Sequence, residues 1–244
     1  MGGDHSVILT YHSLDESGSA ISTAPGVFRQ QMEFLAASGL PVVPLDQALH
    51  RPGSVAITFD DGFCNLLDLA LPVLELCRLP ATAFIVSGYC GRRNLWPHQP
   101  YRGIPNLPLL GWDELSALPA LISLGAHTMT HPDLRRVSPA ECESELHGCQ
   151  AEIEQRTGRP VRWLAYPYGA SSPAVRSLAG RYFDLAVGTS LQFLSTRYDR
   201  LDLPRIDAYY FGRRFRLERL FSGHGGLYIG LRRLLRNIRQ SALR

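Results

Sequence analysis

The sequence has no apolar run of about 18 residues, the length that a helix needs to cross a membrane. Its first residues, 1–6, lack the basic stretch and long apolar core of a signal peptide. We therefore expect a cytoplasmic protein, with a peripheral position at the membrane as a variant considered below. The five cysteines lack the tight spacing of a zinc site, so we interpret them as reduced thiols of the core.

Other absences narrow the class of protein. The 244 residues contain no internal repeat and no low-complexity linker, which favours a single domain. A net charge of +3 is too small to indicate binding to nucleic acid, and we expect none. There is no glycine-rich motif of the G-x-G-x-x-G or Walker type, so no phosphate-binding loop of those kinds is predicted. No pattern indicates an oligomeric state.

Short apolar runs alternate with segments of helical spacing. The runs predict strands at 7–11, 55–59, 82–86, 163–166, 185–188 and 203–206. Helices are predicted around 28–35, at 66–76, from 111, at 139–157, from 173 and at 227–239. This alternation is typical of parallel strands joined by helical crossovers. Because candidate chemistry follows several strand ends, an irregular barrel is a better interpretation than an open sheet.

The first motif is Thr58-Phe59-Asp60-Asp61-Gly62, at the end of a predicted strand. Neighbouring side chains on a strand normally point apart, but a turn at the strand end lets both carboxylates reach one pocket. One carboxylate could then bind a metal while the other stays available as a base. The alternative is an ordinary turn that begins a loop.

The second motif carries His127 and His131, and Pro132 follows it. Two histidines four residues apart could share a helix face, but the intervening Thr-Met-Thr and the proline favour a loop or tight turn. Exposed loop histidines are the alternative interpretation. One carboxylate with two imidazoles is a common ligand set for a catalytic divalent metal that keeps positions open. A third motif, Tyr166-Pro167-Tyr168-Gly169, is by itself an ordinary turn.

Together the three motifs resemble the polysaccharide deacetylases, the NodB-homology enzymes of carbohydrate esterase family 4. The resemblance covers roughly residues 7–210, in the same order and with similar wide spacing. It implies a single-domain distorted (β/α) barrel, here residues 1–220. It also implies one divalent ion, usually zinc, with nickel or cobalt as substitutes. The implied reaction removes an N-acetyl group from an amino sugar, so the implied partner is an N-acetylated carbohydrate.

The resemblance also implies roles for individual residues. Asp60 matches the general base of the family. The implied metal ligands are Asp61, His127 and His131. Tyr168 matches the residue whose backbone N–H helps to hold the oxyanion. The implied substrate-binding residues are Tyr166, Pro167 and Tyr168.

The general acid is a departure from the common pattern. The usual late Leu-x-His motif is absent, and His224 does not match it. Instead, Tyr11-His12 follows the first predicted strand, as in the branch that includes the poly-N-acetylglucosamine deacetylases. This resemblance implies that His12 is the acid, and a structural histidine is the alternative.

A second departure concerns arginine. Many members carry an arginine in the third motif, paired with the catalytic aspartate, but Ala165 stands at that position here. Arg205 is the best replacement, because an opposite charge near Asp60 would keep that carboxyl ionised. The alternative is a structural salt bridge between Arg205 and Asp207.

The C-terminal segment, 221–244, interleaves leucines with Arg232, Arg233, Arg236 and Arg239. We predict a basic amphipathic helix that either packs on the barrel or lies on an anionic membrane surface. Without an export signal, a lipid-linked or nucleotide-linked acetamido sugar is more accessible than a finished extracellular polymer. Two other functions stay open at this point. They are hydrolysis of an amide or imide that is not a sugar, and glycan binding by an inactive module.

Overall fold

A parallel sheet of seven strands forms the centre of the structure, in the order β8-β7-β6-β5-β4-β1-β9. The computed structural model describes residues 6–97, 99, 103–195, 197–212, 216–222 and 225–242, except for the side chains of 236–242. The strands are β1 Val7–Tyr11, β4 Val55–Phe59, β5 Ala81–Ile85, β6 Ile122–Ala126, β7 Trp163–Ala165, β8 Leu185–Val187 and β9 Ile206–Asp207. A separate small sheet pairs β2 Ser13–Leu14 with β3 Ser22–Thr23.

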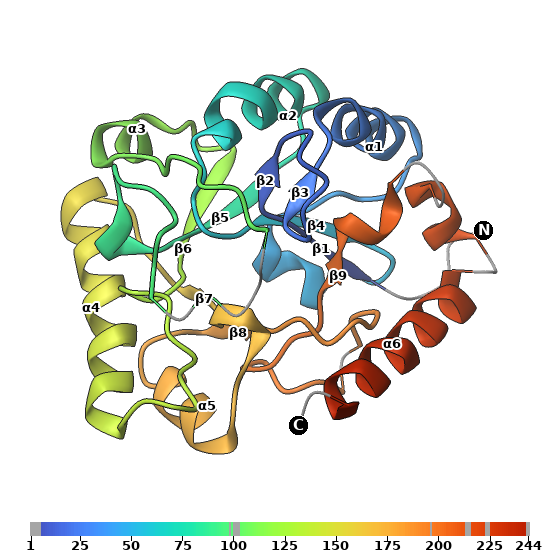
Figure 1. Ribbon diagram of the computed structural model, residues 1–244. Helices are drawn as coiled ribbons and strands as arrows, with labels where there is room; N and C mark the ends of the chain where they lie inside the picture. Colours follow the sequence, from blue (N-terminus) through green and yellow to red (C-terminus); the bar gives the residue numbers. More distant parts are fainter. Residues whose placement is uncertain are drawn as a thin grey trace.

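Helices surround the curled sheet (Figure 1). They are α1 Pro25–Ala37, α2 Leu71–Cys77, α3 Trp112–Ala117, α4 Pro139–Thr157, α5 Pro173–Ala179 and α6 Gly225–Ala242. One π-helical turn, η2 Leu66–Ala70, precedes α2. The 3-10 turns are η1 Leu45–Leu49, η3 Ser87–Tyr89, η4 Pro167–Gly169, η5 Ala208–Phe211 and η6 Leu217–Phe221. The architecture is a half-barrel with helices outside, which confirms the predicted distorted (β/α) barrel.

The ends of α4 follow directly from the sequence. The Ser138 side chain accepts a hydrogen bond from the backbone N–H of Glu141, and the Glu141 carboxylate accepts one from the N–H of Ser138. This reciprocal pair satisfies two N–H groups that the helix leaves open. At the other end Gly158 has φ 68°, a left-handed conformation that glycine adopts without steric cost. The predicted helix 139–157 is confirmed at both bounds.

Both faces of the central strands are buried, as expected for parallel strands covered by helices. Val7, Leu9 and Tyr11 of β1 belong to a large apolar cluster that also contains the inward side chains of α1 and α4. Ile8, between them in the sequence, belongs to a second cluster with Phe84 and others. Strand β1 thus supplies side chains alternately to two cores, one on each face of the sheet.

The predicted strand 203–206 is shorter than expected. Only its last residue joins β9, which pairs with β1. Leu203 instead forms an isolated parallel bridge with Val187 of β8. Pro204 has no N–H to donate to a neighbouring strand, so the ladder breaks there. The segment before β9 therefore spans from β8 toward β1 without becoming a regular strand.

All five cysteines are free. Cys142 and Cys149 are buried on α4, whereas Cys64, Cys77 and Cys90 are only partly buried. The interpretation as core thiols therefore holds fully for the two on α4. Among the described residues, no helix combines the length and apolar character needed to cross a membrane.

Leu146→Ala should lower the free energy of unfolding by about 2–5 kcal/mol, because the truncation leaves a cavity between α4 and the sheet. Leu146 is fully buried. Denaturant unfolding followed by circular dichroism measures the loss. Leu76→Ala is the matched control, since Leu76 is 73% exposed and its loss should stay within about 0.5 kcal/mol. Equal losses in the two variants would contradict the assignment of Leu146 to the core.

Candidate active site

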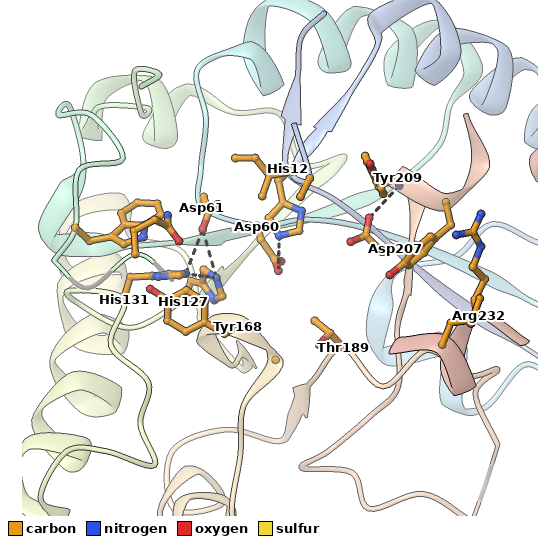
Figure 2. Close-up of a pocket in the computed structure, with 17 residues that line it drawn as sticks. His12, Asp60, Asp61, His127, His131, Tyr168, Thr189, Asp207, Tyr209 and Arg232 are labelled. Atoms are coloured by element: carbon orange, nitrogen blue, oxygen red, sulfur yellow. Dashed lines mark hydrogen bonds and ion pairs between the residues drawn. The ribbon is translucent and has the colours of Figure 1, made fainter. Parts of the chain in front are cut away.

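The three sequence motifs meet at one end of the barrel, where β1, β4, β6 and β7 terminate. They line a cleft of ≈ 540 Å³ (Figure 2). Because these strands are parallel, their carboxyl ends lie at the same edge of the sheet, and loops from several strands contribute to one pocket. The cleft contains Asp60, Asp61, His127 and His131, together with His12 and Tyr168.

Asp61, His127 and His131 form a compact buried cluster. The Oδ1 atom of Asp61 lies 3.5 Å from Nε2 of His127 and 3.4 Å from Nε2 of His131. The two Nε2 atoms are 3.2 Å apart. These three are the group of described residues whose side chains could hold one metal ion. The structure thus brings the predicted ligand set together.

The cluster fits a small divalent cation. Metal–ligand bonds of about 2.1 Å in tetrahedral geometry separate two ligand atoms by about 3.4 Å, which is close to all three observed distances. The Nδ1 atom of His127 is 2.7 Å from the Ala165 carbonyl oxygen. A proton on Nδ1 donated to that carbonyl leaves Nε2 as the lone-pair atom of the ring. Asp61 Oδ1 is buried and receives no hydrogen bond, so its lone pairs also face the cluster.

Left-handed backbone conformations orient the residues of the cluster toward one another. Asp61 has φ 70°, which turns the chain directly after β4 and lets the two adjacent carboxylates share one cleft. Thr128 and His131 have φ values of 66° and 60°. The motif is therefore an irregular loop, as predicted, and not a helix. Left-handed conformations are uncommon outside glycine and carry a steric cost, which surrounding contacts must offset.

Contacts that the sequence did not reveal hold the histidine loop. The Glu145 carboxylate of α4 accepts hydrogen bonds from the N–H groups of Met129 and Thr130, each at 2.8 Å. The Thr128 hydroxyl accepts one from the N–H of His131 at 3.0 Å. Glu145 lies sixteen residues from Met129 in the sequence, and a glutamate on a helix gives no signal of such a role.

Asp60 forms a buried two-point ion pair with Arg205. The distances are 2.7 Å from Nη1 to Oδ1 and 2.6 Å from Nη2 to Oδ2. Burial alone would raise the pKa of the Asp60 carboxyl, but the Arg205 guanidinium outweighs it and holds that pKa well below its usual range. Asp60 is thus ionised at neutral pH. Arg205 pairs with Asp60, and no ion pair between Arg205 and Asp207 forms.

His12 lies beside Asp60. Register between β1 and β4 pairs Tyr11 with Phe59, so the residues that follow, His12 and Asp60, emerge next to each other. The Nε2 atom of His12 is 3.8 Å from Asp60 Oδ2, and 18% of the His12 side chain is exposed. His12 therefore faces the cleft on the side of Asp60, whereas His224 lies outside the described residues.

The residues of the third motif differ in whether they reach the cleft. Tyr168 lines the cleft, and its ring contacts the His131 ring at 4.7 Å between centroids. Its φ of 59° turns the chain within η4. Tyr166 and Pro167, in contrast, are buried and do not line the cleft. The Tyr166 hydroxyl donates to the Leu201 carbonyl, which is a structural bond. Of the three residues predicted to bind substrate, Tyr168 is thus the one that lines the cleft in this structure.

Further residues line the cleft without any signal in the sequence. Trp96 stacks on His131, with 4.4 Å between ring centroids, and so covers one side of the metal-type cluster. Asp207, Tyr209 and Arg232 form the opposite side, as Figure 2 shows. Trp96 comes from a loop, Asp207 from the end of β9, Tyr209 from η5 and Arg232 from α6. Only the fold brings them to the motifs, so sequence spacing could not reveal them.

Comparisons with known proteins agree with this architecture. The chitooligosaccharide deacetylase of a Bradyrhizobium strain is 32% identical over 124 residues, which are 48% of this chain and 46% of that protein. The poly-beta-1,6-N-acetyl-D-glucosamine N-deacetylase of Staphylococcus aureus is 24% identical over 165 residues, covering 61% of this chain and 54% of that protein. The chain thus spans about half the length of these curated relatives.

A solved structure and a family profile complete the comparison. IcaB from Ammonifex degensii shares the fold, with a TM-score of 0.70 at 24% identity over 86% of this chain and 95% of that chain. The profile described as polysaccharide deacetylase matches residues 49–182, more than half of the sequence. This region contains Asp60, Asp61, both cluster histidines and Tyr168. With the motifs inside the matched region and the barrel shared, the chain belongs to the polysaccharide deacetylase family.

Proposed function

We propose that this chain is a metal-dependent hydrolase that removes N-acetyl groups from an amino sugar, in an oligosaccharide, a polysaccharide or a lipid-linked glycan precursor. One observation carries the proposal. An ionised carboxylate that is not part of the ligand cluster, Asp60, directly precedes a ligand of that cluster, Asp61, and both line the same cleft. A hydrolase needs such a separation, because the base must accept a proton while the ligands keep their lone pairs for the metal.

Asp61, His127 and His131 would hold the ion, with zinc favoured and nickel or cobalt as substitutes. When bound, the ion supplies Lewis-acid polarisation of the acetyl carbonyl and of a water molecule. Burial, reinforced by the nearby His127, lowers the pKa of His131 to about 3. His131 is therefore neutral at physiological pH, which is the form that can bind a metal.

The remaining chemistry belongs to residues of the chain. Asp60 accepts the proton that the attacking water loses as its oxygen bonds to the carbonyl carbon. The backbone N–H of Tyr168 donates a hydrogen bond to the carbonyl oxygen as that oxygen becomes negative. His12 donates a proton to the amine nitrogen, the C–N bond breaks, and acetate and a free amine result. Arg205 keeps Asp60 ionised and fixes the orientation of its carboxylate.

The names of two relatives suggest a substrate. One is called a deacetylase of chitooligosaccharides and the other of poly-beta-1,6-N-acetyl-D-glucosamine. We therefore place N-acetylglucosamine units first among the sugars to test. A zinc-supplemented screen that measures acetate release from defined acetylated glycans tests the proposal. Ring opening of cyclic amides or imides without acetate release would contradict the proposal and favour an amide or imide hydrolase. Glycan binding without turnover would contradict it and favour an inactive glycan-binding module.

The leucines of α6 support a membrane position during catalysis. Leu227, Leu231, Leu234 and Leu235 are 76%, 57%, 56% and 48% exposed. Their spacing of four, three and one places them on one side of the helix. Helix α6 contains no acidic residue, and arginines flank these leucines. Exposed leucines beside arginines suit the surface of an anionic bilayer.

Replacement of any one of Asp61, His127 and His131 by alanine should weaken zinc binding by more than about 100-fold, beyond the loss caused by a missing supporting residue. Competition with a chromophoric chelator measures the affinity, and metal analysis after dialysis gives the stoichiometry. Asp60→Asn is the control and should retain one ion per chain. A full equivalent of tightly bound zinc in the His127→Ala/His131→Ala double variant would refute the ligand assignment.

Asp60→Asn should reduce acetate release by roughly 100-fold or more while zinc stays bound, because the variant loses the base and keeps the ligands. His12→Ala should cause a loss of similar size through the missing acid. His147→Ala, at an exposed histidine of α4, is the control and should be silent. Near-normal turnover of zinc-loaded Asp60→Asn would exclude its role. If His224→Ala lowers acetate release and His12→Ala does not, the general acid is His224 and not His12.

The full chain should co-sediment with vesicles that contain anionic lipid, and binding should weaken as salt rises, because charge attraction is screened over about 8 Å at physiological ionic strength. A chain that ends at Ser222, and Leu231→Ser/Leu234→Ser in the full chain, should both lose binding. Leu76→Ser is the matched control at an exposed leucine of α2. Equal binding by all variants, or binding by none, would contradict the membrane role and indicate that α6 only packs on the barrel.

A further inference from the structure

The cleft has a cationic wall opposite the ligand cluster. Arg232 and Leu235, three residues apart on α6, both line it. In Figure 2, Arg232 lies on the side of Tyr209 and Asp207, across the cleft from His127 and His131. The metal-type cluster, with Asp60 and His12, accounts for the hydrolysis of the acetamido group. That chemistry gives no role to Arg232, which lies on α6 and is separate from the cluster.

Neighbouring aromatic residues hold Arg232 in place. Its Nε donates to the Tyr228 hydroxyl at 3.0 Å, and that hydroxyl donates to the Tyr210 carbonyl at 3.0 Å. The guanidinium lies over both rings, 5.4 Å from the Tyr210 centroid and 5.2 Å from the Tyr228 centroid. Stacking of this kind orients a guanidinium while its outer N–H groups stay available. These contacts place a fixed fork of donors at the cleft.

Arg232 has no charge partner among the described residues. Its hydrogen bond is with a tyrosine, and none of the ion pairs of the described chain includes it. Asp207 also lines the cleft, and its Oδ1 accepts the N–H of Tyr209 at 2.9 Å. A carboxylate in that position can accept hydrogen bonds from sugar hydroxyl groups. The wall therefore combines the Asp207 carboxylate with the separate guanidinium of Arg232.

We propose that Arg232 forms an anion subsite for a phosphate group that is attached to the amino sugar. This inference rests on the proposed function, because it places the acetamido group at the ligand cluster and the phosphate at α6. Arginine binds phosphate oxygens with two parallel hydrogen bonds. Leu235 lines the cleft beside Arg232, and the exposed Leu231 and Leu234 continue the apolar surface along α6. A carrier attached to the phosphate would leave the cleft over these leucines.

The test compares a charged and a neutral sugar in solution without vesicles. N-acetylglucosamine 1-phosphate should bind the zinc-loaded wild-type chain about tenfold more tightly than methyl N-acetylglucosaminide, the gain expected from one charge-assisted contact. Titration calorimetry measures both affinities, and acetate release gives kcat/KM. Arg232→Gln should remove the preference by weakening only the phosphorylated sugar. Arg233→Gln, at an exposed neighbour on α6, is the control and should keep the preference.

Further readouts separate charge from structure. Arg232→Lys should restore part of the preference, and rising salt should reduce it in the wild type. No preference in the wild type, or equal losses for both sugars in Arg232→Gln, would overturn the subsite. If the preference is present but neither sugar releases acetate, the subsite stands and the proposed deacetylation fails. If both sugars release acetate with equal efficiency, the proposed deacetylation stands and the phosphate subsite fails.

A second pair of substrates identifies the carrier. We expect a short-chain prenyl diphosphate N-acetylglucosamine to be turned over faster than a nucleoside diphosphate N-acetylglucosamine. Leu235→Ser should lower kcat/KM for the prenyl substrate alone, and Arg232→Gln should lower it for both. Faster turnover of the nucleotide-linked sugar, unchanged in Leu235→Ser, would overturn the lipid carrier.

Discussion

The buried ion pair between Asp60 and Arg205 is the interaction on which the site depends. Arg205 is only 1% exposed, and its guanidinium also donates to the Gly188 carbonyl and the Thr58 hydroxyl. Gly188 follows β8 at one edge of the sheet, and Arg205 precedes β9 at the other. A buried charge left without its partner costs about 3–5 kcal/mol. Through its bond to Gly188, Arg205 links the end of β8 to the chain that leads into β9, and through its ion pair it also fixes Asp60.

This constraint explains why the chain between β8 and β9 is irregular. Leu203 forms a single bridge to Val187 of β8. If residues 203–206 continued as a regular strand, successive side chains would point to opposite faces of the sheet. Pro204 ends that pairing, and the next residue is free to direct its guanidinium inward. The guanidinium also lies over the Phe84 ring, 5.6 Å from its centroid. The same arginine therefore links the chain at the two edges of the sheet and holds the Asp60 carboxylate in place.

The sequence predicted the parts of the structure that local patterns encode. The helix from Pro139 to Thr157 has its cap, its first-turn proline and its terminal glycine in the chain itself. The cluster of Asp61, His127 and His131 was predictable because these residues lie in two short motifs that the family resemblance also matches. Pairing of Asp60 with Arg205 was expected because the resemblance implies an arginine beside this aspartate and opposite charges attract, and the geometry agrees.

Other parts depend on contacts between distant segments. Glu145 and Trp96 support the histidine loop from elements whose sequences show no special pattern. The motif gave no sign that the Tyr166 side chain is buried in the core, where the alternation continued from β7 directs it. Arg232 reaches the cleft only because α6 returns to the barrel mouth. A pattern within a few residues cannot carry such information.

The left-handed residues of the motifs have a consequence for how this chain can change. Asp61, Thr128, His131 and Tyr168 are four of the five described residues other than glycine with positive φ. Each such conformation costs on the order of 1–3 kcal/mol. Glycine would relieve that cost, but at three of the four positions it would remove a side chain that lines the cleft. Selection for thermal robustness and selection for activity therefore oppose each other at these residues, and stabilising changes will accumulate elsewhere in the barrel.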